Sequence, residues 1–71
     1  MRADEREYRE IREGKRNFLV RDFAVPDGEV VGIECNGRTQ YAVILMSERV
    51  GGKWVIGFKT YLGAIKREID E

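Results

Sequence analysis

Three cations in the stretch EGKRNFLVRD are the side chains of this sequence best placed to bind a ligand. Lys15 and Arg16 follow Gly14 directly, and Arg21 interrupts the hydrophobic tract that comes next. Ammonium and guanidinium groups bind phosphates and carboxylates, and arginine does so through two parallel hydrogen bonds. We therefore expect a site for an anion or a nucleotide at this junction.

Two further residues would complete such a site, and each feature also has a structural reading. Asn17 offers an amide that reads a base edge, and Tyr41 offers a ring on which a base can stack. Tyr41 would equally well pack in the core or at a barrel rim. The first two cations would complement the dipole of a preceding helix. Arg21 would face solvent or pair with Asp22 or Glu34.

The composition disfavours several classes of enzyme. The chain has no histidine and a single cysteine, Cys35. Histidine is the commonest general base and metal ligand, and one cysteine cannot build a structural zinc site or an internal disulfide. We expect no metal and no cofactor. A lone cysteine is typical of a reducing compartment, and no apolar run approaches the roughly 18 residues of a membrane span, so we expect a cytoplasmic protein without a membrane partner.

Size and charge set further limits. The 71 residues, of which 42% are hydrophobic, predict one small domain over residues 1–71. Thirteen basic residues balance thirteen acidic ones. A net charge of zero argues against strong, non-specific binding to a polyanion, although a local basic surface is compatible with it.

The cations lie between a predicted helix and a predicted strand. Asp4 and Glu7 form a capping box that begins a helix over 4–13, and Gly14 fits the left-handed position that ends it. A second, short helix is predicted near the C-terminus, where apolar residues follow helical spacing: Tyr61, Leu62, Ile65 and Ile69.

Four strands are predicted between the two helices, over 17–23, 29–35, 38–48 and 53–59. Asn36-Gly37 predicts a two-residue type I′ hairpin turn. The third strand is apolar on both faces, which predicts a central, buried strand. Gly57 indicates a bend or a close backbone approach. Together these features predict an α+β fold: a small, partly open antiparallel β-barrel of four to five strands with a helix at each end of the chain.

The stretch GKRNFLVR resembles the signature of ASCH domains, which have a PUA-like fold. That signature runs glycine, any residue, lysine, two residues, glutamate or threonine, one residue, arginine. Gly14 and Arg21 match it, and the Asp27-Gly28 turn and the strand around Gly57 extend the resemblance to about Tyr8–Phe58. In length and layout the chain is most similar to small phage-encoded ASCH-like proteins.

The resemblance implies binding of RNA or a modified nucleoside between helix and barrel. Some bacterial ASCH members are amidohydrolases that act on acetylated cytidine through the motif lysine, a threonine and a glutamate. Here Arg16 stands at the lysine position and Leu19 at the threonine or glutamate position. Arginine keeps its proton and leucine has no reactive group, so catalysis does not follow from the resemblance, whereas anion binding by Arg16 and Arg21 does.

The expected function is therefore binding of RNA or a nucleotide-like ligand without catalysis, by Lys15, Arg16, Asn17, Arg21 and Tyr41. One alternative is a small phage-type protein-interaction module that blocks or modulates a host protein. Another, ranked last, is a residual nucleoside amidohydrolase that uses a different lysine. Unpaired strand edges are compatible with a monomer or with a dimer through a strand edge.

Overall fold

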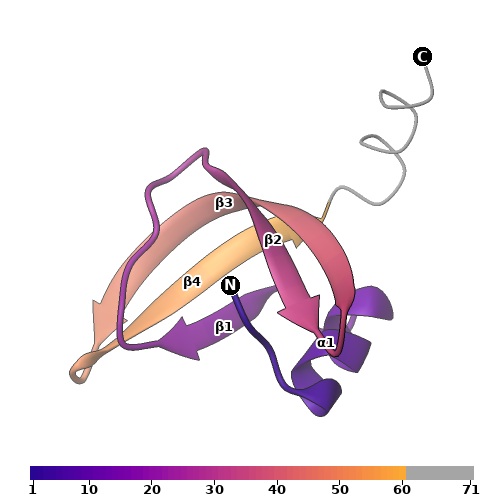
Figure 1. Cartoon of the computed structure of the whole chain (residues 1–71). Coiled ribbons are helices and arrows are strands. Elements are labelled where there is room, and N and C mark those ends of the chain that lie inside the picture. The colour runs from indigo at the N-terminus through magenta and orange to yellow at the C-terminus, as the bar shows by residue number, and fades with distance from the viewer. Residues whose placement is uncertain (61–71) are drawn as a thin grey trace.

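The computed structural model describes residues 1–60, which form one helix and a four-stranded antiparallel sheet (Figure 1). The sheet has the order β1-β4-β3-β2 and curls into a half-barrel. The elements are α1 (Glu5–Arg12), β1 (Phe18–Arg21), β2 (Val30–Cys35), β3 (Arg38–Val50) and β4 (Lys53–Thr60). The predicted helix near the C-terminus lies outside the described residues.

Both ends of α1 are held by the contacts that the sequence predicts. The Glu7 N–H donates to Asp4 Oδ1 at 2.7 Å, and the Asp4 N–H donates to Glu7 Oε1 at 3.1 Å. At the other end Gly14 has φ +75°, and the Lys15 N–H donates to the Glu10 carbonyl at 2.8 Å. This is the Schellman arrangement, which turns the chain sharply from the helix toward β1.

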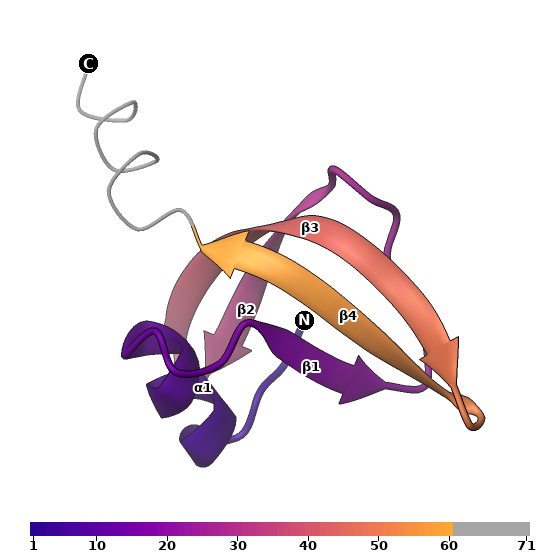
Figure 2. The ribbon, with the colours of Figure 1, turned by 180° about the vertical axis from the view of Figure 1, so that it is seen from behind.

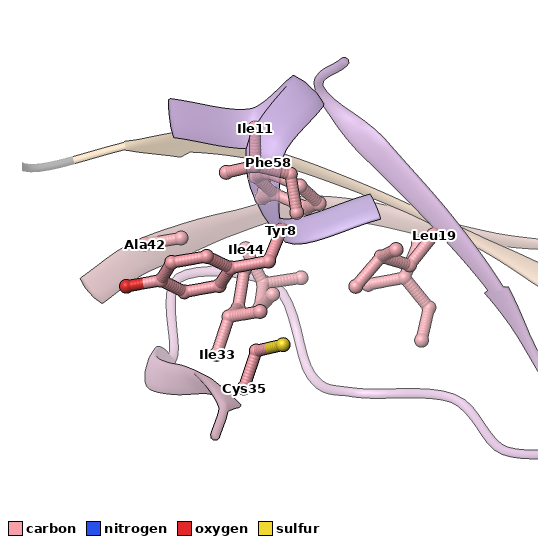
Figure 3. Close-up of a cluster of buried hydrophobic side chains, with 9 residues drawn as sticks. Tyr8, Ile11, Leu19, Ile33, Cys35, Ala42, Ile44 and Phe58 are labelled. Atoms are coloured by element: carbon pink, nitrogen blue, oxygen red, sulfur yellow. The ribbon is translucent and has the colours of Figure 1, made fainter. Parts of the chain in front are cut away.

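The core lies between α1 and the concave face of the sheet (Figure 3). Tyr8 and Ile11, one turn apart on α1, are each 2% exposed. They pack against buried side chains of the sheet: Leu19, Ile33, Cys35, Ala42, Ile44, Ile56 and Phe58. Figure 2 shows α1 beside the start of β1 and the end of β2.

Strand β3 is central in the sheet, as predicted, but the prediction that it is buried is wrong for one of its faces. Its inward residues are buried, but Tyr41 and Leu45 are 46% and 57% exposed, because among residues 1–60 no element covers the convex face. A bulge at Leu45 shifts the register, so that Met46 lies opposite Gly57. A Cβ at Gly57 would come within 3.1 Å of Met46 Sδ, so the neighbour that approaches Gly57 closely is a side chain and not a backbone.

The outer edge of β2 is partly covered by the N-terminal residues. The Glu34 N–H donates to the Met1 carbonyl at 2.7 Å, and the Ala3 N–H donates to the Glu34 carbonyl at 2.9 Å. The Met1 amino group donates to the Gly32 carbonyl at 2.7 Å. Within residues 1–60, no helix has the length and apolar character needed to cross a membrane.

Candidate functional site

Helix α1 carries charged residues on both sides of its buried stripe, and the two flanks differ in kind. Glu7 and Glu10 lie on the flank toward β1, where they meet cations from outside the helix. Arg9 and Arg12 lie on the other flank, toward the hairpin that joins β2 to β3. The flank of Glu7 and Glu10, which we call the carboxylate flank, holds Arg16 and Arg21, two of the cations that the sequence singles out.

Arg21 is a structural link on the carboxylate flank. Its two terminal nitrogens donate to the two carboxylate oxygens of Glu7 at 3.0 and 3.3 Å, and one of them also donates to the Arg2 carbonyl at 2.7 Å. Both side chains of the pair are 20% exposed. The sequence predicted that Arg21 would face solvent or pair with Asp22 or Glu34. Its carboxylate partner is instead Glu7. Arg21 ties β1 to α1 and to the N-terminal segment.

Arg16 forms the second pair of this flank. Its Nε donates to Glu10 Oε1 at 2.8 Å, and its guanidinium lies 5.3 Å from the centroid of the Phe18 ring. The hydrogen bond from Arg16, assisted by Arg6, lowers the pKa of the Glu10 carboxyl. Lys15 lies nearby but is exposed, with its Nζ 3.4 Å from Glu13.

The other two predicted site residues are not gathered with these cations. Asn17 is exposed, and its backbone carbonyl accepts a hydrogen bond from the Phe58 N–H at 2.9 Å. Tyr41 lies on the convex face of the sheet, where its ring packs beside Gly32, while α1 lies on the concave face. The structure thus places Arg16 and Arg21 along one flank of α1 and separates Tyr41 from them.

The opposite flank of α1 contains a hollow of about 340 Å³, which we call the arginine hollow. It is lined by Glu5, Tyr8, Arg9, Arg12, Glu13 and Arg38. Arginine side chains reach it from two directions, since Arg9 and Arg12 come from α1 and Arg38 follows the hairpin turn. Within residues 1–60, neither Arg9 nor Arg12 has a carboxylate oxygen within ion-pairing distance.

The hairpin holds Arg38 at the edge of this hollow. One terminal nitrogen of Arg38 lies 3.4 Å from Glu5 Oε1, and the guanidinium lies 5.0 Å from the centroid of the Tyr8 ring. The side-chain amide of Asn36 donates to the other oxygen of Glu5. Asn36 has φ +51° and Gly37 φ +78°, the type I′ turn predicted from the sequence. That local turn is what brings Arg38 over α1.

Tyr8, one of the residues that line the hollow, carries an unusual buried group. Its hydroxyl is buried and has no hydrogen-bond partner within residues 1–60. Figure 3 shows the phenol oxygen at the edge of the apolar cluster, on the side away from Leu19. A buried hydroxyl without a partner costs free energy and requires an explanation.

A second hollow, of about 320 Å³, lies where the N-terminal residues meet the hairpin. It is lined by Arg2, Ala3, Glu34, Cys35, Asn36 and Gly37. Cys35 is 6% exposed. In the part of the chain that the structure describes, no three Cys, Asp or Glu side chains are grouped to hold a metal ion. The chemistry that the two hollows offer is ion pairing and hydrogen bonding.

The chain has no match among protein-family models, curated proteins or solved structures. The resemblance of the Gly14–Arg21 stretch to ASCH domains therefore stays a prediction.

Proposed function

We propose that this protein is a non-catalytic module that binds RNA or a nucleotide-like ligand in the arginine hollow. The observation that carries the proposal is that three arginines line one hollow and that two of them, Arg9 and Arg12, have no carboxylate within ion-pairing distance among residues 1–60. Arg9 and Arg12 are three residues apart on one helix flank, and Arg38, which follows the hairpin turn, lines the same hollow. Guanidinium groups bind phosphates through paired hydrogen bonds.

The arginine hollow is a better candidate than the cations of the carboxylate flank. Arg16 and Arg21 are already hydrogen-bonded to Glu10 and Glu7. A phosphate that binds Arg21 would have to displace a bidentate pair that is largely buried, and would leave Glu7 uncompensated. Neither Arg9 nor Arg12 is paired with a carboxylate within residues 1–60, so a phosphate that binds them displaces no ion pair.

The predicted ASCH relationship is compatible with this site. The resemblance implies a ligand between helix and barrel, and the arginine hollow lies between α1 and the hairpin of β2 and β3. Within the hollow we find no serine, threonine, cysteine or lysine that would act as a nucleophile. We therefore propose binding rather than hydrolysis.

The test is a titration of labelled single-stranded RNA at two salt concentrations with the wild type and the variant Arg9→Gln/Arg12→Gln. The matched control is Arg49→Gln/Lys59→Gln, which removes two positive charges from β3 and β4. We expect salt-sensitive binding by the wild type, a loss of about tenfold or more in the first variant, and no comparable loss in the control. Equal losses in both variants, or none in the first, would contradict the proposal.

A protein-interaction module is the second candidate, and the convex face of the sheet favours it. Phe18, Gly57 and Met46 lie in one row across β1, β4 and β3, and Phe18 and Met46 are 41% and 38% exposed. The matching partner is a protein with an apolar surface. Salt-insensitive binding of a purified partner, abolished in Phe18→Ser/Met46→Ser and unaffected in Arg9→Gln/Arg12→Gln, would favour this function over the first.

A further inference from the structure

We infer that the ligand of the arginine hollow is a nucleotide with a terminal phosphomonoester, and that Tyr8 supplies a hydrogen bond to it. This inference rests on the proposed function and narrows it from nucleotides in general to those with a free phosphate end. Three observations support it: the charge balance of the hollow, the carboxylates in its lining, and the buried hydroxyl.

The charge balance of the hollow matches a dianion. Of its lining charges, Arg38 is paired with Glu5, and Glu13 is paired with Lys15, each at 3.4 Å. Arg9 and Arg12 remain, with two positive charges that residues 1–60 do not compensate. A phosphomonoester carries about −1.5 to −2 at neutral pH, whereas an internal phosphodiester carries a single charge. The uncompensated pair of arginines therefore fits a terminal phosphate better than a backbone phosphate.

The lining carboxylates disfavour an extended polyanion. Glu5 and Glu13 both contribute to the walls of the hollow. A nucleic-acid strand that passed through would place successive phosphates beside these like charges, which is unfavourable. A single nucleotide brings one phosphate end near these carboxylates rather than a series of phosphates, and 340 Å³ lies in the range of small-molecule sites. The site is built for one compact ligand or for one chain end.

The Tyr8 hydroxyl is the neutral donor of this site. It is buried, unpartnered among residues 1–60, and belongs to a residue that lines the hollow. Arg38 lies over the Tyr8 ring, and its side chain is 56% exposed. A phosphate that engages the Arg38 guanidinium would lie beside the Tyr8 ring, because the guanidinium is 5.0 Å from its centroid. Ligand binding then satisfies a group that the free protein leaves without a partner.

The first experiment compares two RNA oligonucleotides of one sequence, one with a 5′-phosphate and one with a 5′-hydroxyl, and adds nucleoside 5′-monophosphates as competitors. We expect the phosphorylated end to bind about tenfold or more tightly, and the preference to vanish in Arg9→Gln/Arg12→Gln but not in Arg49→Gln/Lys59→Gln. Displacement by monophosphates at similar concentrations would assign a free nucleotide as the ligand. Displacement only by phosphorylated RNA would assign an RNA end.

The outcomes separate this inference from the proposed function. Equal binding of the two RNAs, still dependent on Arg9 and Arg12, would overturn the phosphate-end inference and leave the proposed function standing. No binding of either RNA or of any monophosphate would overturn both.

The second experiment tests Tyr8. Tyr8→Phe removes only the unpartnered hydroxyl, so we expect the unfolding midpoint in urea to stay equal or rise, while affinity for the phosphorylated ligand falls about fivefold. Tyr41→Phe, which removes a hydroxyl from the convex face, is the matched control and should change neither. A Tyr8→Phe protein that loses stability but keeps its affinity would show that the hydroxyl has a structural role, and would overturn its assignment as a ligand donor.

Discussion

Arg16 and Arg21 show that burial decides what an ion pair contributes. Both pair with carboxylates on the same flank of α1, Glu10 and Glu7. The Arg6 side chain also reaches Glu10, at 3.3 Å, but is 78% exposed. Exposed pairs contribute about 0–1 kcal/mol because water screens them and long side chains lose freedom. The pairs of Arg16 and Arg21 are better shielded and hold β1 against the helix, so they are the ones whose loss should be measurable.

Replacing Arg16 should make stability less dependent on pH in acid. The hydrogen bond from Arg16 lowers the pKa of Glu10 below its ordinary value of 4.5. A lowered pKa in the folded state stabilises the protein above the unfolded pKa, and this contribution is lost as the pH falls through the folded pKa. Arg16→Gln should therefore be less stable than the wild type near neutral pH, and the difference should shrink below pH 4.5. Urea unfolding across this range measures it.

The control for this prediction is Arg12→Gln, which removes the same charge from a side chain that makes no ion pair within residues 1–60. The free energy of unfolding of Arg12→Gln should differ little from that of the wild type, and this difference should change little with pH. If the stability gap of Arg16→Gln were constant from neutral pH to acid, the pairing with Glu10 would not be its cause.

At the scale of elements, the end of α1 depends on one backbone conformation. Gly14 has φ +75°, and no side chain or backbone atom lies within 4 Å of where a Cβ would be. A substitution there meets no clash, so its effect comes from the left-handed conformation alone. Gly14→Ala should lower the free energy of unfolding by about 1–2 kcal/mol.

Gly14→Asn is the companion variant, because asparagine tolerates the left-handed region better than alanine. Gly14→Asn should lower the free energy of unfolding by clearly less than Gly14→Ala does in the same urea titration. Equal losses for the two variants would show that the helix end does not depend on the conformation of residue 14.

The elements that sequence patterns predicted well are those set by neighbours in the chain. The capping box of Asp4 and Glu7, the helix end at Gly14 and the turn at Asn36-Gly37 all formed as expected. Strand ends were less accurate: β1 is shorter than predicted, and β3 runs on to Val50 because the Gly51-Gly52 turn is tight enough to continue the hairpin pairing. The exposure of β3 on one face could not be predicted, since it depends on which element covers the sheet.

The candidate site was only partly predictable for the same reason. The sequence predicted cations beside the end of α1; Arg16 pairs there with Glu10, whereas Arg21 reaches the first turn of the helix at Glu7. Their carboxylate partners come from α1 itself, and pairing across elements leaves no periodic signal. The arginine hollow needs Arg38, which the hairpin brings to α1 from a distant part of the chain. The only local hint was the spacing of Arg9 and Arg12 on one helix flank.

At the scale of the whole molecule, the N-terminal segment connects the two edges of the curled sheet. Its backbone pairs with β2 at Gly32 and Glu34, and its Arg2 carbonyl accepts a hydrogen bond from Arg21 of β1. The sheet order leaves β1 and β2 as edge strands. The segment thus bridges the open side of the half-barrel with main-chain groups, and an uncovered edge strand tends to pair with another chain.

Removing residues 1–3 should therefore weaken the fold and promote association between chains. The deletion takes away the partners of Gly32, Glu34 and Arg21 at once, with an expected loss of about 1–3 kcal/mol in urea unfolding. Because the freed edge of β2 can pair with another chain, the weight-average mass measured by sedimentation should rise with protein concentration. Arg2→Ala keeps every one of these main-chain contacts, so it should behave like the wild type in both measurements. A deletion variant as stable and as monodisperse as Arg2→Ala would show that the segment does not close the half-barrel.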